Sequence, residues 1–366
     1  MRAVVKTRPG RGAELRRDVA ERDLRAGEVR LQVKAASVCG TDVAVFEDSS
    51  SAAELDRTLP LTMGHECSAV VVEVCGDTGE LAVGDRVAVE THIACHDCFQ
   101  CRTGRAHNCL RMSLLGIQVD GCFAERVVVP ASTCFPLPES MSFETAALLE
   151  PAGSAMHAVQ RSGADLAGSN VMISGAGPIG LVLVQVARAS GAHHVLVVEP
   201  NEHRRTLARQ QGAVALAPDD DVVGVAHSLS AHRQGFDVAF ECSGAAPALA
   251  SLLDGVRREA TVVSVGLPHR PVEVDVTRYL VKKGLTLQGS FGRQLWQSWE
   301  TLVALVCAGL VDLDGLVSHR LPLDRFEEAF ALVGGDSCKV VLDPTLPEDG
   351  PAEAAQVRRG DPLTLA

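Results

Sequence analysis

The sequence predicts an α/β protein with a strand-rich domain and a second domain built on a doubly wound parallel sheet. Its 366 residues exceed the roughly 250–300 at which a single core stops growing. Up to about residue 138, short apolar runs are separated by glycine-containing turns, a pattern typical of strands. Beyond residue 143, short apolar runs alternate with helix-like stretches, which indicates a parallel sheet covered by helices on both faces.

The order of these runs sets the predicted domain limits. We expect early strands at 29–33, 68–74, 86–89 and 124–129. After a helix at 144–160, strands follow at 170–174, 194–199, 237–242, 260–265 and 285–289, and an amphipathic helix covers 295–309. We therefore predict one domain from residues 1–150 and 296–345, a second from 151–295, and a flexible tail at 346–366 that is rich in Pro, Glu, Asp and Arg.

Composition excludes several classes of function. Hydrophobic residues make up 46% and charged residues 22%, as in soluble globular proteins. No apolar run approaches the roughly 20 residues that span a bilayer, and no apolar block follows the basic residues near Met1. The formal net charge of -12 argues against binding to nucleic acid or to anionic membranes. We expect a cytoplasmic protein.

A glycine-rich turn directly follows the predicted strand at 170–174. In Gly175-Ala-Gly-Pro-Ile-Gly180, Gly175 permits the tight turn, Gly177 lets the backbone approach a pyrophosphate, and Gly180 allows close helix packing. The helix at 181–189 then presents unpaired N–H groups to the phosphates. This predicts a dinucleotide site rather than a plain structural turn.

The strand at 194–199 indicates which dinucleotide is bound. It ends in Glu199, about 20 residues beyond the last glycine. A carboxylate there accepts hydrogen bonds from the ribose hydroxyls and repels a 2′-phosphate, which favours NAD over NADP. Arg204 and Arg205 keep NADP open as an alternative, because an arginine can accommodate that phosphate.

Four of the twelve cysteines cluster at the spacing of a metal site: Cys95, Cys98, Cys101 and Cys109. A looped backbone can direct all four sulfurs at one centre and form a closed tetrahedral zinc site. Because every position is filled by protein, the predicted role is structural. An iron–sulfur cluster is the alternative on ligand type alone.

A second set of candidate zinc ligands is dispersed along the chain. Cys39, His65 and Glu150 offer a thiolate, an imidazole and a carboxylate, which together with water would make an open, catalytic site. Taken singly, each has a structural explanation: a buried apolar filler, a core histidine and a carboxylate at a helix end.

The order of the motifs resembles that of the zinc-containing medium-chain dehydrogenases. Cys39-Gly-Thr-Asp42 is followed by Gly64-His65-Glu66, by Gly-Asp-Arg-Val at 84–87, by the cysteine cluster, by Glu150-Pro151 and by the glycine turn. The resemblance covers residues 1–343. It is closest to the threonine-dehydrogenase group, through stretches such as 91–98, 235–244, 289–293 and 318–326, and more distant to the polyol (sorbitol-type) dehydrogenases.

That resemblance implies a GroES-like catalytic domain interrupted by a Rossmann domain. It implies a catalytic zinc on Cys39, His65 and either Glu66 or Glu150, a structural zinc on the cysteine cluster, a proton-relaying Thr41 and a substrate-contacting His92. It also implies NAD contacts at Ile179, Glu199, Arg204, Val265, Gly266, Leu267, Ser290 and Phe291.

The expected reaction is the oxidation of a secondary alcohol of a small, polar, hydroxylated substrate, with hydride transfer to NAD. Two departures from the threonine-dehydrogenase pattern bear on the substrate. Ala44 stands where that group has a proton-relaying histidine, and Ser154 where it usually has asparagine. The substrate alternatives are therefore a β-hydroxy amino acid, a sugar alcohol or an aminated cyclic polyol.

Two rival functions remain at this point: a ketone reductase of the same fold, and a zinc-stapled binding protein whose enzymatic ancestry has decayed. The retained ligands and glycine turn argue against decay. Because the family is often dimeric or tetrameric, we expect a homodimer or homotetramer, with the strand at 285–289 as a pairing edge.

Overall fold

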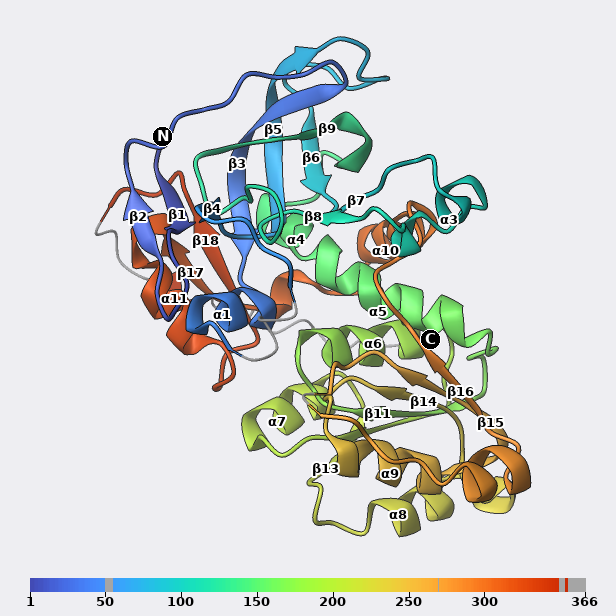
Figure 1. Ribbon diagram of the computed structural model, residues 1–366. Helices are drawn as coiled ribbons and strands as arrows, with labels where there is room; N and C mark the ends of the chain where they lie inside the picture. Colours follow the sequence, from blue (N-terminus) through green and yellow to red (C-terminus); the bar gives the residue numbers. More distant parts are fainter. Residues whose placement is uncertain (50–54, 269, 349–352, 355–366) are drawn as a thin grey trace. The chain divides into compact units, whose positions relative to one another are not determined.

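The computed structural model describes residues 1–49, 55–268, 270–348 and 353–354 (Figure 1). It divides the chain into two compact units. Unit 1 comprises Met1–Thr91, Leu114–Leu148 and Asp312–Ala366, and unit 2 comprises His92–Ser113 and Leu149–Val311. The domain limits predicted from the sequence, 1–150 with 296–345 and 151–295, differ from the limits of these compact units and stay a prediction. The predicted tail at 346–366 lies outside the described residues except for 346–348 and 353–354.

Unit 1 is strand-rich. Its main sheet runs in the order β10-β6-β5-β3-β18-β17-β19, and β9 also pairs with β3. Neighbours are antiparallel except β17 and β18. The strand bounds are β3 Glu28–Ser37, β5 Glu66–Cys75, β6 Arg86–Val89, β9 Arg126–Pro130, β10 Cys134–Pro136, β17 Val317–Pro322, β18 Lys339–Asp343 and β19 Glu353–Ala354.

A smaller sheet and several helices complete unit 1. The sheet has the order β2-β1-β4, with bounds Glu14–Arg16, Ala3–Lys6 and Leu61–Thr62. The helices are α1 Gly40–Glu47, α4 Phe143–Ala147 and α11 Phe326–Leu332, with 3-10 turns at Ala131–Thr133, Asp314–Leu316 and Leu323–Arg325.

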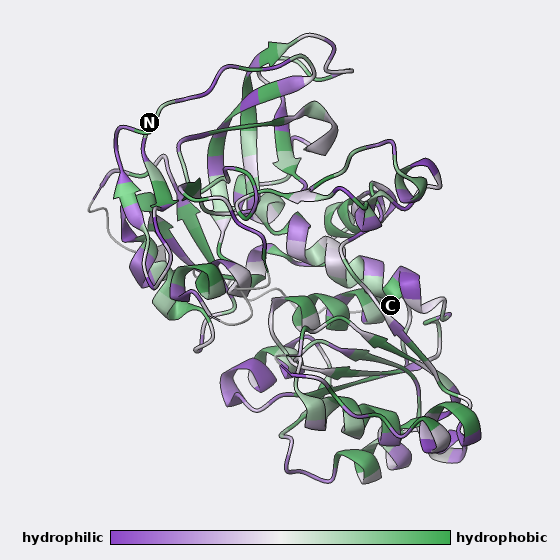
Figure 2. Ribbon diagram, viewed as in Figure 1, coloured by the Kyte–Doolittle hydropathy of each residue, from purple (hydrophilic) through white to green (hydrophobic). Residues whose placement is uncertain are grey.

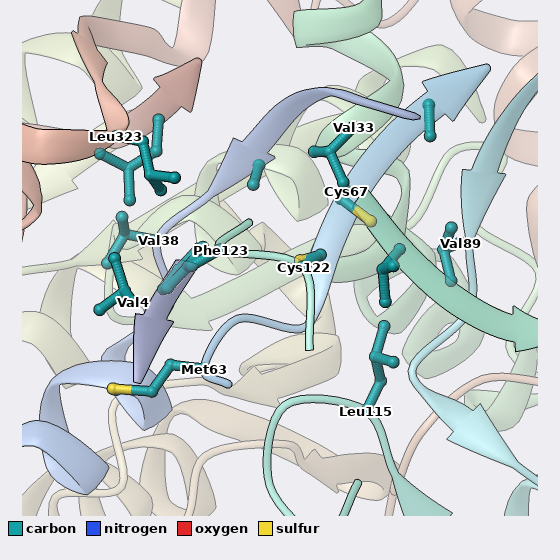
Figure 3. Close-up of a cluster of buried hydrophobic side chains, with 14 of the residues drawn as sticks. Val4, Val33, Val38, Met63, Cys67, Val89, Leu115, Cys122, Phe123 and Leu323 are labelled. Carbon is teal, nitrogen blue, oxygen red and sulfur yellow. The ribbon is translucent and has the colours of Figure 1, made fainter. Parts of the chain in front are cut away.

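The core of unit 1 lies between its sheets and helices. β3 alternates buried and half-buried residues from Glu28 to Val33, as expected of a strand with one face on a core. Figure 3 shows part of the buried cluster, including Met63, Phe123 and Cys122. Removing these side chains from water stabilises the fold that carries the candidate metal ligands.

Unit 2 contains a parallel sheet in the order β13-β12-β11-β14-β15-β16. This is the 3-2-1-4-5-6 order of dinucleotide-binding folds. The bounds are β11 Asn170–Ser174, β12 His194–Val198, β13 Val214–Leu216, β14 Phe236–Glu241, β15 Val256–Ser264 and β16 Thr286–Gly289.

Helices cover both faces of this sheet. Figure 1 shows α5 and α6 on one face and α8 and α9 on the other, and Figure 2 shows hydrophobic residues along the strands between them. The helices are α5 Leu149–Ser162, α6 Pro178–Ala189, α7 Glu202–Gln210, α8 Val222–Leu229, α9 Ala246–Gly255 and α10 Gln297–Cys307, with shorter turns at Ala231–Arg233 and Thr277–Lys282.

The cysteine loop of unit 2 contains little regular structure. β7 (His92–Ile93) precedes it and β8 (Ser113–Leu114) follows it in the sequence. Between them lie only the short helix α3 (Phe99–Arg102) and a 3-10 turn at Ala106–Asn108. A segment of this kind has few apolar contacts of its own, so its shape depends on what its cysteines bind.

The predicted fold class is confirmed, and one predicted element is corrected. The helix expected at 144–160 consists of two helices, α4 and α5, that meet at Leu148. Pro151 lies in the first turn of α5, where its missing N–H leaves no hydrogen bond unmade. Among the described residues, no helix is both long and apolar enough to cross a membrane.

Candidate active site

The backbone before β5 places the first ligands. Gly64 has φ 93°, a left-handed conformation that favours glycine. A Cβ at this position would lie 2.4 Å from Cδ1 of Phe123, so no other residue fits. His65 and Glu66 follow directly and are buried, and the hydroxyl of Thr91 donates a 2.7 Å hydrogen bond to the carbonyl of His65. The main chain therefore holds both ligands firmly.

Asp42 connects two of the predicted ligands. It lies in the first turn of α1, and its carboxylate accepts hydrogen bonds from the backbone N–H of Cys39 (2.9 Å) and from Nδ1 of His65 (3.0 Å). Because a carboxylate here only accepts, the ring proton is on Nδ1 and Nε2 is left for a metal. Burial lowers the pKa of His65, but Asp42 and Cys39 outweigh it and raise that pKa well above its ordinary value, so a metal ion that binds Nε2 must displace a proton from it.

Glu66 is held through one of its two carboxylate oxygens. Nζ of Lys339 and the hydroxyl of Ser37 both donate to Oε2. Lys339 also donates to the carbonyl of Val38 at 3.2 Å. Oε1 is buried and has no hydrogen-bond partner among the described residues, which is costly unless a cation binds there.

These side chains fit a metal ion. One ligand atom each from Cys39, His65 and Glu66 lies within 4.8 Å of the others. Thiolate, imidazole and carboxylate are the donor types of catalytic zinc sites with three protein ligands, which leave a coordination position for substrate. The buried Oε1 of Glu66, which has no hydrogen-bond partner among the described residues, independently indicates that the Glu66 carboxylate binds a cation.

The first turns of α1 also carry Thr41 and Ala44. Thr41 is half-buried and lies two residues after Cys39. Ala44 packs against the hydrophobic core of unit 1. Its methyl group cannot donate or accept a proton, so Ala44 itself cannot relay one.

In unit 2 the four clustered cysteines come together. The sulfurs of Cys98 and Cys101 are 3.5 Å apart, those of Cys98 and Cys109 3.9 Å, and those of Cys95 and Cys101 4.0 Å. Zinc–sulfur bonds of about 2.3 Å in a tetrahedron give sulfur–sulfur edges of about 3.8 Å. The separations match that figure and are far too long for disulfides.

Backbone N–H groups surround these sulfurs. The N–H of Cys98 donates to Cys95, and those of Cys95 and Arg111 donate to Cys109, at 3.3–3.4 Å. Hydrogen bonds from the Cys101 and Leu110 backbone lower the pKa of the Cys98 thiol to about 6. Such donors stabilise thiolates, the form that binds zinc.

Glu150, the other predicted carboxylate ligand, lies in the first turn of α5 in unit 2 and makes an ion pair. Its Oε1 accepts a 2.5 Å hydrogen bond from the buried Arg293. Arg293 also donates to the hydroxyl of Ser154 (3.0 Å) and to Nδ1 of His92 (2.9 Å). A guanidinium only donates, so the proton of neutral His92 lies on Nε2.

The dinucleotide turn has the geometry that its glycines predict. Gly175 has φ 87°, and a Cβ on Gly180 would lie 1.9 Å from the carbonyl oxygen of Gly175. Gly177 is the N-cap of α6, and a Cβ there would meet nothing within 4 Å. Gly175 and Gly180 are thus required by the protein itself, whereas Gly177 leaves open space beside the helix N-terminus, where a pyrophosphate fits.

Glu199 follows β12 and is buried against this turn. It accepts hydrogen bonds from the N–H of Ala176 (2.6 Å) and of Asn201 (2.9 Å). Arg205 donates to the carbonyls of Glu199 (2.6 Å) and Pro200 (2.7 Å), so its guanidinium supports the main chain. Arg204 lies in the first turn of α7, and its N–H is capped by Asn201.

The remaining predicted cofactor residues lie in unit 2 at or after the strands of its sheet. Ile179 is half-buried at the start of α6, and Val265, Gly266 and Leu267 follow β15. Ser290 and Phe291 follow β16. Leu267 and Phe291 are exposed large apolar residues.

Several residues that organise these sites have no role predicted from the sequence: Ser37, Asp42, Glu241, Arg293 and Lys339. Glu241 ends β14, is buried, and accepts from the hydroxyl of Ser174 (3.1 Å) and from the N–H groups of Ser243 (2.8 Å) and Gly244 (2.9 Å). Asp42 had a local signal, because it lies three residues after Cys39 in a helix N-terminus. Lys339, which pairs with Glu66, had no such signal, because it lies 273 positions away in the sequence.

Comparisons with known proteins agree with this geometry. The family model of the alcohol dehydrogenase GroES-like domain matches residues 25–139, and that of the zinc-binding dehydrogenases matches 178–308. L-threonine 3-dehydrogenase of Pyrococcus horikoshii is 40% identical over 349 residues, which cover 93% of this chain and 98% of that protein.

Solved structures show the same fold. A zinc-binding dehydrogenase from Sinorhizobium meliloti 1021 bound to NADP has a TM-score of 0.85 at 30% identity and covers 94% of this chain and 99% of its own. 2R,3R-butanediol dehydrogenase from Bacillus subtilis has a TM-score of 0.84 at 29% identity, with coverage of 94% and 99%.

The fold, the glycine turn and the matching family models together define a nicotinamide-dependent oxidoreductase with a GroES-like and a Rossmann domain. The chain belongs to the zinc-binding alcohol dehydrogenase family. It is a zinc-containing, NAD-dependent enzyme that oxidises a secondary CH–OH group, as the sequence predicted.

Proposed function

We propose that this enzyme oxidises the secondary hydroxyl of a small β-hydroxy amino acid, of the kind that L-threonine represents. The 40% identity to a threonine 3-dehydrogenase over nearly the whole of both chains supports this most directly. The Glu150–Arg293–His92 cluster adds a buried polar group of the kind that binds a charged substrate better than an aliphatic alcohol.

We propose roles for the residues of unit 1. Cys39, His65 and Glu66 would hold a zinc ion, which would supply Lewis-acid polarisation of the substrate hydroxyl. Thr41 accepts the hydroxyl proton and passes it on, since its side chain both accepts and donates. Glu66 is the carboxylate ligand of the resting enzyme, because one of its carboxylate oxygens lies within 4.8 Å of the ligand atoms of Cys39 and His65. Its Oε1 also has no hydrogen-bond partner among the described residues.

In unit 2 we propose that Cys95, Cys98, Cys101 and Cys109 hold a structural zinc. We propose Glu150 as either the alternative carboxylate ligand to Glu66 or a fixed acceptor for Arg293. His92, with its proton on Nε2, donates a hydrogen bond to a polar group of the substrate.

A second candidate substrate is a polyol or aminocyclitol. Ala44 and Ser154 favour it, because both differ from the threonine-dehydrogenase pattern at positions next to proposed site residues. Ser154 also bonds Arg293, so this change alters the cluster around Glu150.

A substrate screen decides between these candidates. NADH formation is measured with hydroxy amino acids, polyols and aminocyclitols, and the ketone products are assayed in the reverse direction. We expect kcat/KM for L-threonine or a close analogue to exceed that for polyols and aminocyclitols at least about tenfold, a transition-state difference of about 1.4 kcal/mol. The reverse order would assign the second candidate, and turnover only from the ketone side would make the enzyme a reductase.

We propose that Glu199 sets the preference for NAD. Glu199→Ala should abolish the difference in affinity between NADH and NADPH, measured by titrating the fluorescence of their reduced nicotinamide rings, because the repulsion of a 2′-phosphate is lost. Glu199→Gln should reduce the difference while keeping an acceptor for the N–H of Ala176. The exposed Glu300→Gln serves as control, and an unchanged preference in both Glu199 variants would remove this role.

We also propose a cytoplasmic homodimer or homotetramer. β16 ends the parallel sheet, so its outer backbone groups lie at a sheet edge where a second copy could pair. Light scattering of the purified protein tests the assembly, and a monomeric mass would contradict it.

A further inference from the structure

A hollow of about 1020 Å³ in unit 2 lies apart from every residue assigned above. It is bordered by α8, the turn before β14, the end of α9, the start of β15 and the turn at Thr277–Lys282. The strands are parallel, so this is the amino end of the sheet. The dinucleotide turn follows the carboxyl end of β11 and therefore belongs to the opposite edge.

The lining of this hollow is cationic, although the chain carries a net charge of -12. Its basic side chains are Arg233, Arg257, Arg258, Arg278, Lys282 and Lys283. Asp254 and Asp275 are the lining carboxylates among the described residues. These charges come from separate segments of the chain, so the fold, and not one basic run, brings them together.

Part of this positive charge is already neutralised. Arg233 and Arg257 share the carboxylate of Asp237, each at 2.8 Å, and Arg278 pairs with Asp254 at 2.6 Å. Two of the other cations, Arg258 and Lys283, contact carbonyl groups instead. Arg258 donates to the carbonyl of Lys282 at 2.7 Å, and Lys283 to those of Leu253 and Asp254 at 2.6 and 3.0 Å. A carbonyl orients a cation but does not cancel its charge.

The cations of the hollow also affect one another. Burial lowers the pKa of Lys283; Asp254 acts in the opposite direction, and the positive charges of Arg278 and Arg258 lower that pKa further. An anion between these groups would relieve the repulsion. Guanidinium and ammonium groups together are the donors that proteins use for phosphate.

We propose that this hollow binds a chain of two or three phosphates, as inorganic polyphosphate or as the phosphate chain of a nucleotide. The opening is larger than one phosphate needs, and the cations are distributed over several of its walls. Apart from Val223, the described lining residues are polar or charged, so charge and not apolar contact selects the ligand. This site is independent of the proposed substrate.

The test is calorimetric titration of the zinc-loaded enzyme with inorganic tripolyphosphate while NAD saturates the dinucleotide site, with zinc content measured before and after. We expect about one tripolyphosphate per chain, with an affinity that falls as salt rises. Lys282→Glu should weaken binding about tenfold or more. The side chain of Lys282 is exposed and makes no hydrogen bond or ion pair with the described residues, so this change should spare the fold. Arg258→Glu is the second variant.

Arg8→Glu is the matched control, because it changes the net charge equally at an exposed position of unit 1. ATP in a further titration distinguishes the sources: affinity equal to that of tripolyphosphate assigns the phosphate chain alone, and a higher affinity assigns a nucleotide. The proposal is overturned if tripolyphosphate does not bind, if Lys282→Glu and Arg8→Glu behave alike, if orthophosphate binds as tightly, or if an oligonucleotide binds more tightly than tripolyphosphate.

Discussion

Asp42 shows how one buried carboxylate organises the candidate zinc site. It bonds the main chain of one ligand, Cys39, and the ring of another, His65. The first bond fixes the start of α1, and the second selects the tautomer whose Nε2 binds metal. The same side chain therefore connects the local geometry of a helix N-terminus to the chemistry of the site.

Asp42→Asn tests this role with little change in shape. We expect zinc affinity at the Cys39 site to fall about 10–100-fold, because an amide is a weaker partner for the imidazole N–H than a carboxylate. The measurement is chelator competition with zinc counted per chain: wild type should hold about two ions, and the variant about one once the chelator is present. Asp77→Asn, in an exposed turn, is the control, and equal zinc retention in both variants would contradict the role.

At the scale of secondary-structure elements, the glycines in the turn from β11 into α6 have two different roles. The fold requires Gly180, whereas the bound dinucleotide requires Gly177. A Cβ on Gly180 would overlap the carbonyl of Gly175, whereas a Cβ on Gly177 would project into open space. Gly177 has φ -68°, which alanine adopts without strain. The two positions should therefore respond differently to the same substitution.

Gly177→Ala should leave the Tm of the cofactor-free protein within about 1 °C of wild type and weaken NAD binding about tenfold or more, because the methyl group occupies the pyrophosphate position. Gly180→Ala should lower the Tm by several degrees as well, because the overlap must be relieved by moving the helix. Calorimetry measures the Tm and fluorescence titration the affinity. A loss of Tm in Gly177→Ala equal to that in Gly180→Ala would contradict this distinction.

For the molecule as a whole, a buried histidine links stability to pH. The ring of His157 in α5 packs 4.9 Å from that of His107. Its Nδ1 is buried without a hydrogen-bond partner among the described residues. Burial, with the charges of His107, Arg161 and Arg293, lowers the pKa of His157 to about 4. In the unfolded chain the pKa of a histidine is about 6.5, so the unfolded state binds the proton at a higher pH than the folded state does.

The free energy of unfolding should therefore decrease between about pH 6.5 and pH 4 through this residue. Its contribution is fully present above the unfolded pKa and is lost as pH falls towards the folded one. In His157→Leu that decrease should be shallower than in wild type, measured by urea denaturation at a series of pH values. His203→Leu, at an exposed position, should keep the wild-type slope. Parallel curves for wild type and His157→Leu would refute the assignment.

The sequence by itself determined the fold class, the glycine turn, the cysteine cluster and the identity of Cys39, His65 and Glu66 as ligand types. Each of these features depends on residue types and on their spacing within a short segment. They can therefore be recognised without knowing which distant residues lie nearby in the fold. The sequence left Glu66 and Glu150 as alternatives and offered no role for Lys339 or Arg293.

Only the tertiary structure decided which side chains share a buried environment. Lys339 pairs with Glu66 across 273 positions, and Arg293 with Glu150 across 143. A buried carboxylate needs a cation or hydrogen-bond donor beside it, and any element packed against it can supply that group. The spacing of residues along the sequence therefore does not predict which residue it is. The same reason explains why the cationic hollow at the amino end of the parallel sheet has no motif in the sequence.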